Sequence, residues 1–132
     1  MRILIVEDDA DFAHLMAKYL EAIGECEFAV NGMDAVESVR LAFEEEKPFD
    51  LICLDIMMPT MDGQEALIKI RGLEQAEGLR VGEGAKIIMV TALSDDQNKI
   101  KSFVGLCDAY ITKPFDKDDL FAKLRDIELI YT

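Results

Sequence analysis

Five short apolar segments recur along the chain, and stretches with a helical period separate them. The apolar segments are Ile3–Val6, Cys26–Val30, Leu51–Leu54, Ile87–Val90 and Ala109–Thr112. The first, third and fourth are apolar at consecutive positions, which is typical of parallel strands covered by helices on both faces. The pattern therefore predicts five β-strands, most of them buried.

The segment after the first strand predicts an amphipathic helix. Its apolar positions follow one helix face: Phe12, Leu15, Met16, Tyr19, Leu20 and Ile23. Gly24 comes directly afterwards, and we expect it to end the helix in a left-handed conformation.

Four further helices are predicted from apolar periodicity and from capping residues. They are expected over about 33–46 with Asn31 near the start, from about Gly63, from Ser94 with Gln97 three residues later in a capping-box pattern, and after Asp116 as cap. The segment Gly72–Ala85 has four glycines and no clear period, and we expect a long loop there.

This alternation of strands and helices predicts an α/β fold with a parallel sheet and helices on both faces. The chain of 132 residues has the length of one domain. It contains no linker, repeat or low-complexity tract. We therefore expect a single domain over residues 1–132.

Chemically capable side chains follow four of the predicted strands. Glu7 and Asp8 follow the first strand, Asp55 the third, Thr91 the fourth, and Lys113 the fifth. In an open parallel sheet, ligands bind beyond the carboxyl ends of the strands. The sequence thus predicts one site at that edge.

Carboxylates gathered at one edge would repel each other, so a cation should bind among them. Oxygen ligands without histidine or cysteine suit Mg²⁺. A carboxylate can also attack phosphorus and form an acyl phosphate. In that case a metal ion, the ammonium of Lys113 and the hydroxyl of Thr91 would balance the phosphoryl charge.

Each of these residues also has a structural interpretation when it is taken alone. Acids that follow a strand often cap the next helix, as we expect of Asp9, and Glu7 and Asp8 could do the same. A lysine before proline can simply be solvated, and a threonine at a strand end is ordinary. Their joint placement at four strand ends favours the functional interpretation.

Composition excludes several classes of function. Asp and Glu number 27 against 14 Lys and Arg, which gives a net charge of −13. So acidic a chain is repelled by nucleic-acid phosphates and by anionic lipid surfaces. Three widely spaced cysteines favour free thiols in a reducing compartment, and no apolar run reaches membrane-span length. We expect a cytoplasmic protein that binds neither nucleic acid nor membrane directly.

Four blocks of sequence resemble, in their order, the receiver domain of two-component response regulators: ILIVEDD, LICLDIMMPTMDG, KIIMVTAL and DAYITKPF. The resemblance covers nearly the whole chain. It implies a flavodoxin-like doubly wound (βα)5 sandwich whose five-stranded parallel sheet has the strand order 2-1-3-4-5. It is closest in type to the stand-alone receivers of chemotaxis.

The resemblance also implies roles for individual residues. Asp55 would be the phosphoacceptor, and Mg²⁺ (or Mn²⁺) would bind Glu7, Asp8, Asp55 and the backbone carbonyl of Met57. Thr91 and Lys113 would contact the phosphoryl group, and the Lys113–Pro114 bond would be cis. Thr91 and Tyr110 would form the switch that responds to phosphorylation.

A receiver implies protein partners and is not an enzyme in the usual sense. It would take its phosphoryl group from a histidine kinase or histidine phosphotransfer protein and act on a downstream protein target, which the sequence does not identify. We expect that target near Ile100, Lys101, Phe103 and Tyr110. A phosphorylation-linked homodimer is left open. The chain ends shortly after the fifth helix, so we expect no output domain.

Two positions depart from several relatives and suggest a long-lived phosphorylated form. Met57 and Leu93 lie two residues beyond Asp55 and Thr91, and neither can orient a hydrolytic water by hydrogen bonding. We therefore expect slow self-dephosphorylation. Two alternatives are a phosphate-independent interaction module and a Mg²⁺-dependent phosphatase with an aspartyl-phosphate intermediate. The phosphatase would need an acid–base Asp where Met57 stands.

Overall fold

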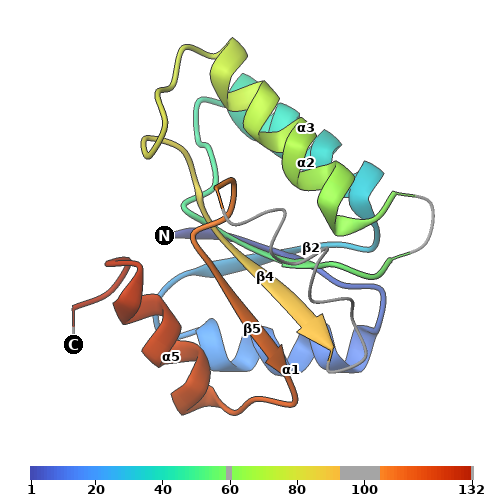
Figure 1. The fold of residues 1–132 in the computed structure, drawn as a ribbon, viewed down its shortest axis with the longest axis vertical. Coiled ribbons are helices and arrows are strands. Elements are labelled where there is room, and N and C mark those ends of the chain that lie inside the picture. The colour runs from blue at the N-terminus through green and yellow to red at the C-terminus, as the bar shows by residue number, and fades with distance from the viewer. Residues whose placement is uncertain (59–60, 93–104, 132) are drawn as a thin grey trace.

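The computed structural model describes residues 1–58, 61–92 and 105–131, and it contains a parallel sheet with helices on both faces (Figure 1). The strands are β1 (Arg2–Val6), β2 (Glu25–Ala29), β3 (Leu51–Asp55), β4 (Lys86–Ala92) and β5 (Ala109–Lys113). Their order in the sheet is β2-β1-β3-β4-β5, and every pairing is parallel. The predicted α/β fold and strand order are confirmed.

Four helices lie within the described residues: α1 (Ala10–Leu20), α2 (Gly32–Glu44), α3 (Gly63–Ala76) and α5 (Lys117–Asp126). Helices α2 and α3 cover one face of the sheet, and α1 and α5 cover the other (Figure 1). The predicted capping residues Asn31 and Asp116 cap α2 and α5, and Asp9 caps α1. The predicted helix from Ser94 lies outside the described residues.

The core has two halves because β1, β3 and β4 present apolar side chains to both faces. Leu4 and Val6 pack toward α2 and α3, whereas Ile3 and Ile5 pack toward α1 and α5. The edge strand β2 is mostly exposed, as its polar interruptions predict. Among the helices in the described part of the chain, none combines the length and apolarity that a membrane crossing requires.

The end of α1 differs from the prediction. The helix ends at Leu20 with Glu21 in a right-handed conformation, and Gly24 is not left-handed. Gly24 is needed for a different reason, because a Cβ atom there would overlap the carbonyl oxygen of Met1. Leu15, which was expected on the apolar face, is 41% exposed.

The predicted loop over Gly72–Ala85 is also wrong in its first part, because α3 continues to Ala76. Arg71 and Glu74 lie one turn apart on this helix and form an ion pair. The polar residues of this turn hide its helical period. The three cysteines, all of them in described residues, form no disulfide.

Candidate functional site

The carboxyl ends of β1 and β3 bring the predicted acidic residues together. Val6 pairs with Leu54, so the residues that follow them, Glu7 and Asp55, lie side by side. Ligand oxygens of Glu7, Asp8 and Asp55 all lie within 4.8 Å of one another. We call these three residues the acidic cluster. Glu7 and Asp55 are buried, and Asp8 is exposed.

Lys113, at the end of β5, supplies a positive charge to the acidic cluster. Its Nζ atom lies 3.2 Å from Oε1 of Glu7 and 3.6 Å from Oδ2 of Asp55. The other carboxylate oxygen of Asp55, Oδ1, accepts a hydrogen bond from the backbone N–H of Met57 at 3.1 Å. The two oxygens of Asp55 are therefore held by different partners.

One ammonium does not neutralise three neighbouring carboxylates, and the pKa of Glu7 reflects this. Burial, followed by the hydrogen bond and charge of Asp55, raises the pKa of Glu7 from 4.5 to about 7, while Lys113 opposes the rise. Near neutral pH the acidic cluster therefore retains a proton or attracts a cation.

The donor set fits Mg²⁺. All three side-chain ligands are carboxylates, and Mg²⁺ prefers oxygen ligands and keeps several waters. The exposed side of the acidic cluster at Asp8 leaves room for such waters, whereas Glu7 and Asp55 anchor its buried side. The acidic cluster could therefore hold a divalent cation.

Thr91 lies near the end of β4 and is fully buried, as its position in the sheet requires. Its hydroxyl lies 3.1 Å from the hydroxyl of Thr112, its register partner on β5, and 3.4 Å from the carbonyl oxygen of Ile111. In this structure Thr91 thus hydrogen-bonds across to β5. Tyr110, on the same edge strand, is 46% exposed.

Lys113 lies over the ring of Phe12, which in turn contacts Phe115, and the sequence pattern did not predict this arrangement. The Nζ atom of Lys113 lies 4.3 Å from the centroid of the Phe12 ring. Phe115 contacts Phe12 edge-on, with 5.6 Å between ring centroids. The Lys113–Pro114 bond between them is cis, as the resemblance implied.

Of the remaining predicted positions, one lies within the described residues and the others lie outside them. Met57 lies in the loop after β3, and its side chain is 62% exposed. Leu93, together with Ile100, Lys101 and Phe103 of the expected partner surface, lies outside the described residues.

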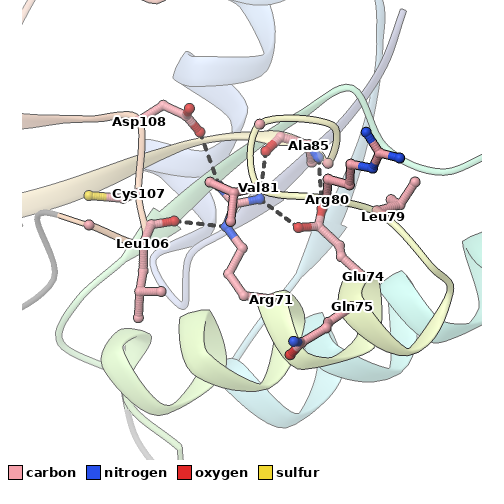
Figure 2. A pocket seen from close by; sticks show the side chains of 13 residues that line it. Arg71, Glu74, Gln75, Leu79, Arg80, Val81, Ala85, Leu106, Cys107 and Asp108 are labelled. Carbon is pink, nitrogen blue, oxygen red and sulfur yellow. Dashed lines mark hydrogen bonds and ion pairs between the residues drawn. The ribbon is translucent and has the colours of Figure 1, made fainter.

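A second group of charges lies at the opposite edge of the sheet, beside a cavity of about 480 Å³ (Figure 2). Arg71 donates to Glu74, to Asp108 and to the carbonyl oxygens of Ala85 and Leu106. Glu74 is buried and also accepts from the Ala85 N–H. These groups satisfy one another, so the cluster joins α3 to the segments that precede β4 and β5.

Comparisons with known proteins agree with this geometry. The chain is 33% identical to the chemotaxis protein CheY of Halobacterium salinarum over 96% of this chain and 95% of that one. A CheY-like receiver domain structure from Methanospirillum hungatei superposes with a TM-score of 0.71 at 34% identity, covering 95% of this chain and 90% of that one. The Saccharomyces cerevisiae Ssk1 receiver was crystallised with the histidine phosphotransfer protein Ypd1. It superposes with a TM-score of 0.75 at 27% identity, covering 93% of this chain and 85% of that one.

Four other curated relatives, named as transcriptional or regulatory proteins, are 33–36% identical, and the chain spans 44–48% of their length. The expectation of a stand-alone domain therefore stays a prediction. The family model described as "Response regulator receiver domain" matches residues 3–125. The chain therefore belongs to the response regulator receiver domains, which are signalling domains of two-component systems rather than classical enzymes.

Proposed function

We propose that this receiver accepts a phosphoryl group on Asp55 from a histidine kinase or a histidine phosphotransfer protein, in a Mg²⁺-dependent reaction. The observation that carries the proposal is the environment of the Asp55 carboxylate. It is buried in the acidic cluster, and the Lys113 ammonium lies 3.6 Å from its Oδ2 atom. A nucleophile, a candidate cation site and a charge-balancing group are thus within reach of one another.

The chemical step is a transfer between two nucleophiles. A carboxylate oxygen of Asp55 attacks the phosphorus of a phosphohistidine, an O–P bond forms, and the P–N bond breaks. The histidine nitrogen leaves with the electron pair, and one proton from solvent makes the departing ring a neutral imidazole. The Met57 N–H fixes the orientation of the carboxylate, and Lys113 offsets the added negative charge.

Receiver domains bind Mg²⁺ at an acidic pocket, and the acidic cluster of this chain could hold such an ion. We assign Glu7, Asp8 and Asp55 as side-chain ligands, with the backbone carbonyl of Met57 as a further ligand, for Mg²⁺ or Mn²⁺. When bound, the ion would supply positive charge that lowers the repulsion between the carboxylates and the incoming phosphoryl group.

Phosphorylation would shift an equilibrium between two arrangements of Thr91 and Tyr110. In the arrangement described above, the Thr91 hydroxyl lies against Thr112 and the Tyr110 ring is partly exposed. The phosphoryl group offers Thr91 a charged acceptor in place of a neutral one, and charge-assisted hydrogen bonds are the stronger kind. The surface around β5 and α5 would change as a result.

The partners proposed here are proteins. Receiver domains interact with histidine kinases or phosphotransfer proteins, and the Ssk1 receiver was crystallised with Ypd1. The net charge of −13 disfavours direct contact with nucleic acid or anionic lipid. We propose that output passes through phosphorylation-dependent protein contacts, including the option of a homodimer.

The test is direct phosphorylation with a small donor. The purified protein is incubated with acetyl phosphate and Mg²⁺, and intact mass is measured with and without EDTA. We expect one added phosphoryl group that is stable in acid, labile in base and absent in EDTA. Asp55→Asn should abolish the label. Asp50→Asn, at the other end of the β3 segment, is the matched control and should retain it.

Absence of label on the wild-type protein would refute the proposal. Equal labelling of Asp55→Asn and the wild type would place the acceptor elsewhere and would refute the assignment of Asp55.

A further inference from the structure

The flexible side chain of Lys113 ends near two acids and near solvent. Its side chain is 28% exposed, and its ammonium lies nearer to Glu7, at 3.2 and 3.3 Å, than to Asp55, at 3.6 Å. A lysine side chain loses considerable rotamer freedom when it is fixed in one place. A contact in addition to the two acids would further restrict where the ammonium lies.

The ring of Phe12 is placed to do this. Lys113 Nζ lies 4.3 Å from the ring centroid, within the range in which an ammonium is attracted to an aromatic face. The ring carries no formal charge and does not titrate. Its attraction for Lys113 is therefore retained when Glu7 or Asp55 changes its protonation or binds a cation.

Three features of the sequence hold this ring in place. Asp9 caps α1 and accepts hydrogen bonds from the backbone N–H groups of Asp11 and Phe12, which fixes the first turn of the helix. Phe115 packs edge-on against Phe12 with an interplanar angle of 82°. Both rings also pack against the core between the sheet and helices α1 and α5, which share one face in Figure 1.

We propose that Phe12 is a positioning residue for phosphoryl transfer, whose ring face holds the Lys113 ammonium beside Asp55. The inference rests on the proposed function, since it assigns Lys113 a role in balancing the phosphoryl charge. Phe12 acts through Lys113 and need not touch the phosphodonor. Its contribution comes from the electrostatics of the ring as well as from its volume.

The experiment separates these two contributions by replacing Phe12 with mono-, di- and trifluorinated phenylalanine. Ring fluorination weakens the negative face and leaves size and shape nearly unchanged. We expect the rate constant of phosphorylation by acetyl phosphate to fall with each added fluorine, by about three- to tenfold for the trifluorinated ring. Phe12→Tyr keeps the π face and should remain within about twofold of the wild type.

Phe121 provides a matched control in the same chain. Its ring lies 5.5 Å from the Nζ atom of Lys117 on α5, in a pair that is not part of the site. The same fluorination series at Phe121 should leave the rate constant unchanged. The inference would be overturned if the rate constant did not change with fluorination at Phe12. It would also be overturned if fluorination lowered the rate constant equally at Phe12 and Phe121.

A second measurement does not depend on activity. The ring should shift the ε-CH₂ protons of Lys113 upfield in the NMR spectrum, and Phe12→Leu should abolish that shift. If the unsubstituted protein takes no label from acetyl phosphate, the proposed function fails. If it is labelled and the fluorinated series is flat, only the role of Phe12 fails.

Discussion

The acidic cluster should destabilise the metal-free protein at neutral pH, and Asp55→Asn should relieve this. The rise in the Glu7 pKa from 4.5 to about 7 corresponds to about 3 kcal/mol. Protonated Glu7 therefore makes the folded state more stable by about this amount at low pH than at high pH. The full stabilisation is present below pH 4.5, where Glu7 is protonated in both the folded and the unfolded state. It is lost as the pH rises through 7, because the folded state must then carry the buried charge.

Asp55→Asn removes one part of this penalty. Burial is the largest cause of the raised pKa of Glu7 and remains in the variant, so we assign about 1 kcal/mol to the Asp55 carboxylate. The asparagine oxygen can still accept from the Met57 N–H. The variant loses its pairing with Lys113, which keeps its closer partner Glu7 at 3.2 Å.

We therefore expect Asp55→Asn to raise the free energy of unfolding by about 1 kcal/mol at pH 8 in EDTA. At pH 5 Glu7 is protonated in the folded state, so the gain should vanish. Urea unfolding followed by circular dichroism at both pH values measures the difference. Asp126→Asn, which removes an exposed charge on α5, is the control and should show no such pH dependence. A variant less stable than the wild type at pH 8, or an equal gain at both pH values, would refute the electrostatic reasoning.

Four further predictions concern single groups. Mg²⁺ affinity, measured by calorimetry, should fall between pH 8 and pH 6 because Glu7 takes up a proton with a pKa of about 7; constant affinity would contradict this. Thr112→Val removes the hydroxyl partner of Thr91 at 3.1 Å, and we expect phosphorylation by acetyl phosphate to become about two- to fivefold faster, not slower. Met57→Asn should accelerate loss of the phosphoryl group, followed as phosphate release, because an amide can orient water; an unchanged rate would remove the apolar explanation for slow decay. Arg71→Met leaves the buried carboxylate of Glu74 without its cation and should lower the free energy of unfolding by about 3 kcal/mol, while phosphorylation of the folded protein is retained.

The buried strands and the gathering of acidic residues at their carboxyl ends could be predicted from sequence for a simple physical reason. Buried parallel strands are apolar on both faces, so Ile3–Val6 and Leu51–Leu54 stand out from the rest of the chain. Because the carboxyl ends of parallel strands lie at the same edge of a sheet, polar residues directly after such strands are placed close together there. The placement of Glu7 beside Asp55 follows from that geometry and from the strand order that the resemblance supplied.

Contacts between distant segments were not accessible in this way. Arg71 pairs with Asp108 across 37 positions of sequence, and no local pattern marks the pair. Phe12 was predicted only as part of an apolar helix face, because periodicity assigns a residue to a face and not to a neighbour. Gly24 was misassigned because a close approach of backbone and a left-handed turn both require glycine.

Two charged groups at opposite ends of the strands differ in how their charges are balanced. Beside the cavity, Arg71 and Lys86 meet Glu74 and Asp108, so two cations face two carboxylates in ion pairs. At the carboxyl-terminal edge, the three carboxylates of the acidic cluster share Lys113 alone among the described ion pairs. A balanced group has little affinity for added ions, whereas an unbalanced one lowers its free energy by binding a cation or a proton. The excess negative charge that lowers the stability of the metal-free fold therefore also drives cation binding at the proposed site. A substitution that removes this charge, such as Asp55→Asn, should stabilise the protein and abolish its phosphorylation together.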